Sequence, residues 1–273
     1  MNENENEKLT AGRAADQPIT VSRISVTPVK GLALHHPEQI EVATHGVVGD
    51  RLFFLVDVKR DLISVTEIGE LTRHRSEYDP RTRTLQVYDE ASLLLGGVIE
   101  PGDAVAIDFY GLRTVTGHLI DGGWAELFST IAGRPVALVM ADTGAQDVTP
   151  LTLLGTASTA ELAARNGIGP VDGRRFRMTL EFDGGTPHIE DNWDGRLLRL
   201  GDVAARVGGP VQRCAATTRH PETGVINLQT LRMIGAYRGR QQSAFGLGFN
   251  FGVYAEVVTP GSIRVGDVIT VGD

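Results

Sequence analysis

Hydrophobic positions along the chain fall mainly into short alternating or apolar runs, and turn residues separate these runs. Between residues 21 and 119 the pattern predicts strands, because alternation with a period of two is typical of a half-buried strand. The expected strands are Ser22–Val29, Gln39–Ala43, Arg51–Val58, Thr84–Tyr88, Val105–Phe109 and Leu112–Leu119. This part of the chain is therefore expected to be mostly β.

Helical patterns follow in the second half, between further short strands. The expected helices are Trp124–Ala132, Ser158–Asn166 and Leu228–Tyr237. The second is the clearest, because Ser158 and Glu161 have the spacing of a capping box and Gly167 stands where a left-handed cap belongs. The remaining expected strands are Val136–Met140, Arg177–Phe182, Leu197–Leu200, Val203–Val207, Cys214–Thr218, Val253–Val258 and Val268–Val271.

These elements predict a mostly β (α+β) protein with two β-barrel-like domains and a few helices. The 33 glycines and 12 prolines fit a chain with many tight turns. We expect a disordered tail over residues 1–18, one domain over 19–135 and a second over 136–273. The boundary follows the predicted helix Trp124–Ala132, which ends at Gly133 and Pro135.

Composition excludes several classes of protein. The 34 acidic and 26 basic side chains give a net charge of −8, which argues against a general binder of nucleic-acid backbones. The single cysteine, Cys214, excludes an internal disulfide, a Cys-rich zinc site and a protein-held iron–sulfur cluster. Neither a secretory signal nor a long apolar segment is present, so we expect a cytoplasmic protein with no membrane partner.

The sequence contains neither of two common nucleotide-binding motifs, and its histidines do not have the spacing of a metal site. Neither a P-loop nor a strand-following G-x-G-x-x-G occurs, which argues against P-loop and Rossmann enzymes. The seven histidines are scattered and form no His/carboxylate triad.

Cys214 has an unusual sequence context. A lone cysteine is most often a small buried hydrophobe. Here Arg213 and Arg219 flank it and His220 is near, a cationic setting that favours the thiolate needed for nucleophilic attack or for ligation of a soft metal. The context leaves both kinds of chemistry open.

Basic side chains also gather on three predicted turns. Lys30 precedes Gly31, Arg51 follows Asp50 in a glycine-flanked turn, and Arg174, Arg175 and Arg177 lie within four residues. Taken singly, these segments have ordinary interpretations: a strand-end turn, a hairpin with a local salt bridge and a solvated strand edge. Together with a single thiol they indicate a phosphate-bearing ligand held near a thiolate.

Seven segments together resemble a known family. They are PVKG at Pro28–Gly31, GVVGDR at Gly46–Arg51, RFR at Arg175–Arg177, ED-W at Glu190–Trp193, GDV at Gly201–Val203, RC-TT-PETG at Arg213–Gly224 and FGVYAEVVTPGSIRVGD at Phe251–Asp267. Their order and spacing are similar to those of MOSC-domain proteins of the amidoxime-reducing family. The similarity covers about residues 20 to 271, with a MOSC N-terminal β-barrel domain before the MOSC domain.

This resemblance implies a molybdenum cofactor, a molybdopterin, held between the two domains. Cys214 would ligate the molybdenum beside the two dithiolene sulfurs of the pterin and would be the catalytic residue. The stretch Thr152–Ser158 and the segment from Asn250 to Tyr254 would also lie at the site. The residues expected to bind the cofactor are Lys30, Gly31, Arg51, Thr156, Arg175, Arg177, Thr179, Gln212, Arg213 and Asn250.

The same resemblance implies an oxidoreductase that removes oxygen from small N-hydroxylated substrates. Electrons would come from a separate flavin or iron–sulfur reductase. The chain departs from the family pattern at Thr179, which replaces an asparagine, at Gln212, which replaces a small hydroxyl residue, and at Gly155, which replaces a serine. The alternative is sulfur transfer or cofactor delivery, with Cys214 carrying a persulfide or the metal.

Overall fold

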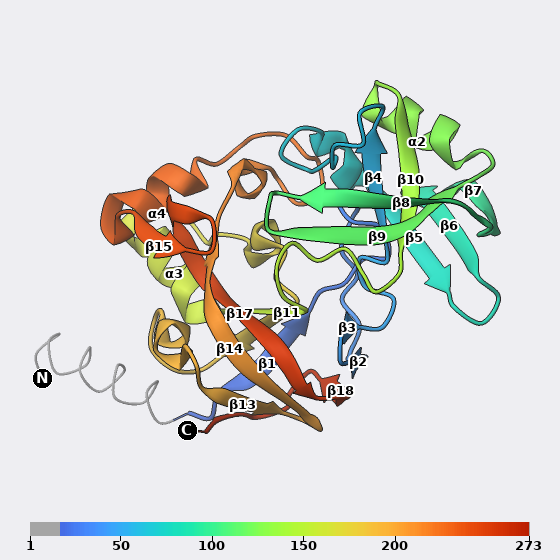
Figure 1. Cartoon of the computed structure of the whole chain (residues 1–273). Helices are drawn as coiled ribbons and strands as arrows, with labels where there is room; N and C mark the ends of the chain where they lie inside the picture. The colour runs from blue at the N-terminus through green and yellow to red at the C-terminus, as the bar shows by residue number, and fades with distance from the viewer. Residues whose placement is uncertain (1–16, 273) are drawn as a thin grey trace, which may run out of the picture.

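The computed structural model describes residues 17–272, in two β-rich halves that face each other (Figure 1). Most of the disordered tail predicted over residues 1–18 lies outside the described residues. The mostly β architecture predicted from the sequence is confirmed. Within residues 17–272, no helix has the length and apolar content needed to cross a membrane.

One half is built on a seven-stranded sheet that closes almost into a barrel. In spatial order its strands are β1 (Thr20–Ile24), β12 (Leu180–Asp183), β11 (Leu151–Gly155), β17 (Asn250–Thr259), β14 (Val203–Gln212), β13 (Leu197–Leu200) and β19 (Ile269–Val271). The first and last strands approach each other, because Thr20 forms a β-bridge with Val268 and Ile269 donates its amide to the carbonyl of Ile19. Apolar side chains such as Leu153, Val207 and Val253 fill the interior.

The other half contains a four-stranded and a three-stranded antiparallel sheet. The first consists of β4 (Phe53–Asp57), β10 (Val136–Ala141), β9 (Arg113–Ile120) and β8 (Pro101–Phe109), and the second of β5 (His74–Asp79), β6 (Thr84–Asp89) and β7 (Ser92–Val98). Helix α2 (Trp124–Ala132) buries Trp124 and Phe128 in the core of this half. A small sheet of β18 (Gly261–Arg264), β2 (Gln39–Ala43) and β3 (Gly46–Val47) packs its apolar side chains into the core of the barrel half.

Two helices and several short elements complete the barrel half. Helices α3 (Thr156–Arg165) and α4 (Thr230–Arg238) lie at one side of the barrel, as Figure 1 shows. The hairpin of β15 (Gln241–Ser243) and β16 (Gly246–Gly248) follows α4. The 3₁₀ helices of this half are Gly173–Phe176, Ile189–Trp193 and Ala215–Thr218, whereas Gly69–Arg73 lies in the other half, where Leu71 joins the core.

Several predicted elements match the structure, and others need correction. Trp124–Ala132 has the predicted bounds, and Gly133 caps it with a φ of 67°. The capping box at Ser158 was wrong, because α3 begins at Thr156 and the hydroxyl of Ser158 instead donates to Glu190. The strand predicted over Cys214–Thr218 was also wrong. Two threonine hydroxyls donate to carbonyls three residues back, at 3.0 and 2.6 Å, and favour a 3₁₀ turn there.

Three of the predicted strands are shorter or displaced. Ser22–Val29 ends at Ile24, Arg51–Val58 begins at Phe53, and Arg177–Phe182 begins at Leu180. Arg177 has a φ of 52°, a left-handed conformation that no regular strand accepts.

The pairing of strands crosses the predicted domain boundary. β1 lies in the sheet of the barrel half, and β10 pairs with β4 and β9 of the other half. The segments 19–135 and 136–273 therefore share their sheets. Their division into two domains stays a prediction.

Candidate functional site

A cavity of about 160 Å³ lies where the two halves meet. Its walls include nearly all the residues that the sequence singled out: Lys30, Gly31, Arg51, Arg175, Arg177, Thr179, Gln212, Arg213 and Cys214. These residues come from segments far apart in the chain, so the fold brings the basic turns and the single thiol to one place.

One wall of the cavity is cationic. The ammonium group of Lys30 donates to the carbonyl of Ala145 at 2.7 Å and to the carboxylate of Asp147 at 2.6 Å. Arg51 forms an ion pair with the buried carboxylate of Asp50 and donates to the carbonyl of Arg177 at 2.9 Å. Arg177 itself donates to the carbonyl of Leu32 at 2.7 Å. Arg51 and Arg177 are thus joined directly, and Lys30 lines the same cavity.

Burial lowers the pKa of two side chains in this cationic wall. Burial, followed by repulsion from Arg51, lowers the pKa of Arg177 to about 9. Burial also lowers the pKa of Lys30, although the neighbouring carboxylate of Asp147 opposes the shift. Both changes show that positive charge is costly here, so an anionic group in the cavity would stabilise the wall.

Cys214 is the residue just before the 3₁₀ helix Ala215–Thr218. Its side chain is exposed and lines the cavity, which excludes the interpretation of a buried hydrophobe. The hydroxyl oxygen of Thr66 lies 3.4 Å from its sulfur. The thiol is therefore free to react with or ligate a group inside the cavity.

Arg213, beside the thiol, is held by the protein interior. Its guanidinium donates to the carbonyl of Phe251 at 2.8 Å and to that of Phe176 at 2.9 Å. Burial lowers its pKa to about 10. Arg213 thus fixes the backbone around the cavity while keeping its positive charge near Cys214.

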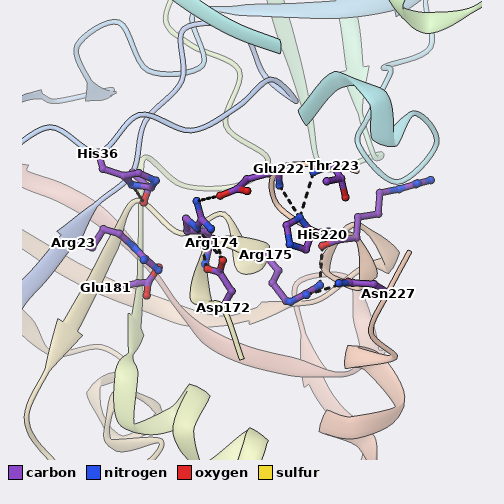
Figure 2. A network of polar contacts seen from close by, with 12 residues as sticks. Arg23, His36, Asp172, Arg174, Arg175, Glu181, His220, Glu222, Thr223 and Asn227 are labelled. Carbon is purple, nitrogen blue, oxygen red and sulfur yellow. Dashed lines mark hydrogen bonds and ion pairs between the residues drawn. The ribbon is translucent and has the colours of Figure 1, made fainter. Parts of the chain in front are cut away.

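The segment after Cys214 is fastened by two arginines of the 3₁₀ helix Gly173–Phe176 (Figure 2). Arg175 donates to the carbonyl of Arg219 at 2.8 Å and to the side chain of Asn227 at 3.0 Å. Arg174 forms ion pairs with Asp172 and Glu222. Of the three arginines in this run, Arg175 and Arg177 line the cavity and Arg174 does not, so only these two are placed to meet an anion there.

Two of the predicted site residues lie outside the cavity lining, and their contact with a cofactor stays a prediction. Thr156 begins helix α3 and donates its hydroxyl to Asp183 at 2.6 Å. Asn250 is buried and donates to the carbonyl of Gln242 at 2.9 Å, while its side-chain oxygen has no hydrogen-bond partner.

The three residues that depart from the family pattern each fit their surroundings in this structure. The hydroxyl of Thr179 lies 3.3 Å from that of Thr152, and the side-chain oxygen of Gln212 accepts from Ser243 at 2.6 Å. A side chain at Gly155 would meet the ring of Phe182 at 3.1 Å, so glycine suits this position.

Sequence reasoning missed several residues that line the cavity. Thr66, Tyr110 and Asp147 are among them, and Tyr254 was placed there only through the stretch that contains it. Burial raises the pKa of Tyr254 above its ordinary value of 10.0, so its hydroxyl is protonated at neutral pH and available as a donor. No local pattern marks the first three residues, which reach the cavity only through the tertiary fold.

Comparison with known proteins finds a family model and curated relatives that match part of this chain. The sequence model of the MOSC domain matches residues 142–270. A 127-residue segment is 32% identical to human mitochondrial amidoxime-reducing component 1, covering 45% of this chain and 37% of that protein. The bovine mitochondrial amidoxime reducing component 2 matches with the same identity and coverage.

Solved structures show looser likenesses. The YuaD protein from Bacillus subtilis is 12% identical with a TM-score of 0.43, covering 93% of this chain and 96% of that one. YiiM from Geobacillus stearothermophilus is 15% identical with a TM-score of 0.35, covering 64% and 73%.

The chain thus carries a MOSC domain. It is related to the amidoxime-reducing components, and its matched segment spans little more than a third of their length.

Proposed function

We propose that this protein is a molybdenum-cofactor oxidoreductase that removes oxygen from small N-hydroxylated or related N–O compounds. The observation that carries the proposal is that an exposed thiol, Cys214, and a wall of three cationic side chains line the same cavity. Relatedness to proteins named amidoxime-reducing components supports the reaction type.

The residues present fit a cofactor that combines a soft metal with an anionic phosphate. A thiolate is the ligand type that soft metal centres prefer, and Cys214 is the thiol that would ligate the metal. Lys30, Arg51 and Arg177 would hold the phosphate, because charge-assisted bonds from such donors are strong and directional. Within residues 17–272, no cluster of three His, Cys, Asp or Glu side chains offers a competing metal site.

The other predicted cofactor-binding residues differ in whether they line the cavity. Gly31, Arg175, Thr179, Gln212 and Arg213 line the cavity and are proposed as further cofactor-binding residues. Thr156 and Asn250 are not among the lining residues, and their contact with the cofactor stays a prediction.

When bound, the cofactor supplies a two-electron redox centre for the removal of an oxygen atom from the substrate. The protein's own part is to bind and orient. Tyr254 keeps its proton at neutral pH, so it offers a hydroxyl hydrogen bond to a polar group of a substrate in the cavity. Electrons would come from a separate flavin or iron–sulfur protein. The cytoplasmic location expected from the sequence stays a prediction, since the curated relatives are named as mitochondrial.

Sulfur transfer is the alternative function, because an exposed Cys214 could also carry a persulfide. Reduction of benzamidoxime by the chemically reduced holoprotein separates the two. The oxidoreductase turns over benzamidoxime to benzamidine, and Cys214→Ala abolishes this turnover. A holoprotein that contains molybdenum, forms a persulfide at Cys214 and shows no turnover would contradict the proposal.

A further inference from the structure

Tyr110 occupies a turn position that disfavours its residue type. It lies in the tight turn between β8 and β9, where Leu112 donates its amide to the carbonyl of Phe109 at 3.1 Å. Tyr110 and Gly111 have φ values of 60° and 72°. Turns with positive φ at both central residues strongly prefer asparagine, aspartate or glycine at the first of them. A tyrosine held there against local preference is the kind of conflict that marks functional positions.

The side chain of Tyr110 lies at the rim of the cavity. It lines the cavity together with Cys214, and 48% of the residue is exposed. Asp147 belongs to the same lining as Tyr110 and Cys214. An aromatic surface thus borders the route between solvent and the thiol.

The ring is held in place from both sides. Phe109 meets it edge to face at a centroid distance of 6.3 Å and an interplanar angle of 66°. Phe245 does the same at 6.2 Å and 73°, and it comes from the β15–β16 hairpin of the opposite half. Such edge-to-face pairs are favourable beyond the area they bury. The ring is therefore a fixed wall of the entrance, built by both halves of the molecule.

The hairpin that carries Phe245 is itself anchored to the cavity. Ser243 donates its hydroxyl to Gln212 and accepts the amide of Phe245 at 3.1 Å. Asn250 donates to the carbonyl of Gln242 at 2.9 Å. Two of the predicted site residues, Gln212 and Asn250, thus hold the hairpin that supports the aromatic wall.

We propose that Tyr110 forms an aryl subsite at the entrance of the cavity, with Phe245 as its positioning residue, and that this protein prefers substrates in which the carbon that bears the N–O group also carries an aromatic ring. The proposal deepens and rests on the proposed function. A planar ring stacks against or meets the edge of Tyr110 while its N–O group reaches the part of the cavity beside Cys214. An aliphatic substrate of the same headgroup lacks this contact.

The test compares benzamidoxime with acetamidoxime in the holoprotein. Tyr110→Asn suits the turn and should fold at least as well as the natural chain, whereas Tyr110→Phe keeps the ring and removes only the hydroxyl. We expect Tyr110→Asn to lower the ratio of kcat/KM for benzamidoxime over acetamidoxime about tenfold, with Phe245→Ala lowering it less. Tyr110→Phe and the distant exposed variant Leu93→Ala should retain the ratio.

Equilibrium binding of benzamidoxime without reductant gives a readout independent of turnover. Its Kd should rise about tenfold in Tyr110→Asn and change little in Tyr110→Phe. Unchanged selectivity and affinity in Tyr110→Asn, or equal losses in Tyr110→Phe, would overturn the aryl subsite. If neither compound is reduced but the difference in binding persists, the proposed function fails and the subsite stands.

Discussion

The hydroxyl oxygen of Thr66 lies 3.4 Å from the sulfur of Cys214, although 148 positions separate the two residues along the chain. Arg219 creates this proximity, because its guanidinium donates to the carbonyls of Thr66 at 2.8 Å and Glu67 at 3.3 Å. The same guanidinium donates to the carbonyl of Gly224 at 2.9 Å. One side chain thus ties the turn that carries Thr66 to the loop that carries the thiol.

Replacement of Arg219 by glutamine should loosen this connection. The variant leaves three carbonyls without their cationic donor, and we expect the free energy of unfolding to fall by about 2 kcal/mol. Urea denaturation measures the loss, and faster hydrogen exchange should be confined to the segments around Thr66 and Cys214. Arg232→Gln, at an exposed position on α4, is the matched control. Equal stability of the two variants would contradict the assigned role of Arg219.

Lys30 should be necessary for retention of the cofactor. Lys30→Gln removes a positive charge from the cationic wall, and charge-assisted bonds of this kind contribute about 1.5–3 kcal/mol. Molybdenum per chain should therefore fall by about tenfold or more after dialysis of the purified variant. Lys59→Gln, at an exposed lysine, serves as the control and should retain the metal. Full occupancy in Lys30→Gln would show that the cationic wall does not hold the cofactor.

His188 should make stability depend on pH. Burial, together with the charge of Arg238, lowers its pKa from 6.5 to about 4. Between these values the unfolded chain binds the proton and the folded chain does not, so stability should rise with pH from about 4 to 6.5. The contribution is complete above pH 6.5 and is lost as the pH falls toward 4.

Urea denaturation across this pH range tests the His188 effect. His188→Asn should flatten the slope, and asparagine tolerates the left-handed backbone found at this position, where φ is 62°. The exposed His45→Asn variant should keep the natural slope. A slope that is identical in the His188 variant and the natural chain would rule out this residue as its source.

The sequence pointed to several of the side chains that line the cavity, but not to the shape of the cavity. The residue types alone indicated a function for Cys214, Lys30, Arg51 and Arg177, because a thiol can ligate a soft metal and cationic side chains can bind an anion. The structure then brought them to one cavity. Tyr110 could not be found this way, because its role depends on Phe245 from the other half of the molecule.

Local patterns failed where distant groups compete for the same atoms. Ser158 and Glu161 have the spacing of a helix cap, but the buried carboxylate of Glu190 lies close enough to accept the serine hydroxyl at 2.8 Å. The two threonines after Cys214 suggested a strand, whereas Arg175 donates to the carbonyls of Thr217 and Arg219 and holds the segment as a turn. Both outcomes depend on residues that no short window of sequence contains.

The central claim is that Cys214 and the cationic wall together hold a molybdenum cofactor. Metal analysis of the protein purified from a molybdate-replete host, beside its Cys214→Ser variant, tests it most directly. We expect about one molybdenum per chain in the natural protein and loss of the thiolate-to-metal absorption in the variant. A natural protein that contains no molybdenum, even after reconstitution with the cofactor, would contradict the account.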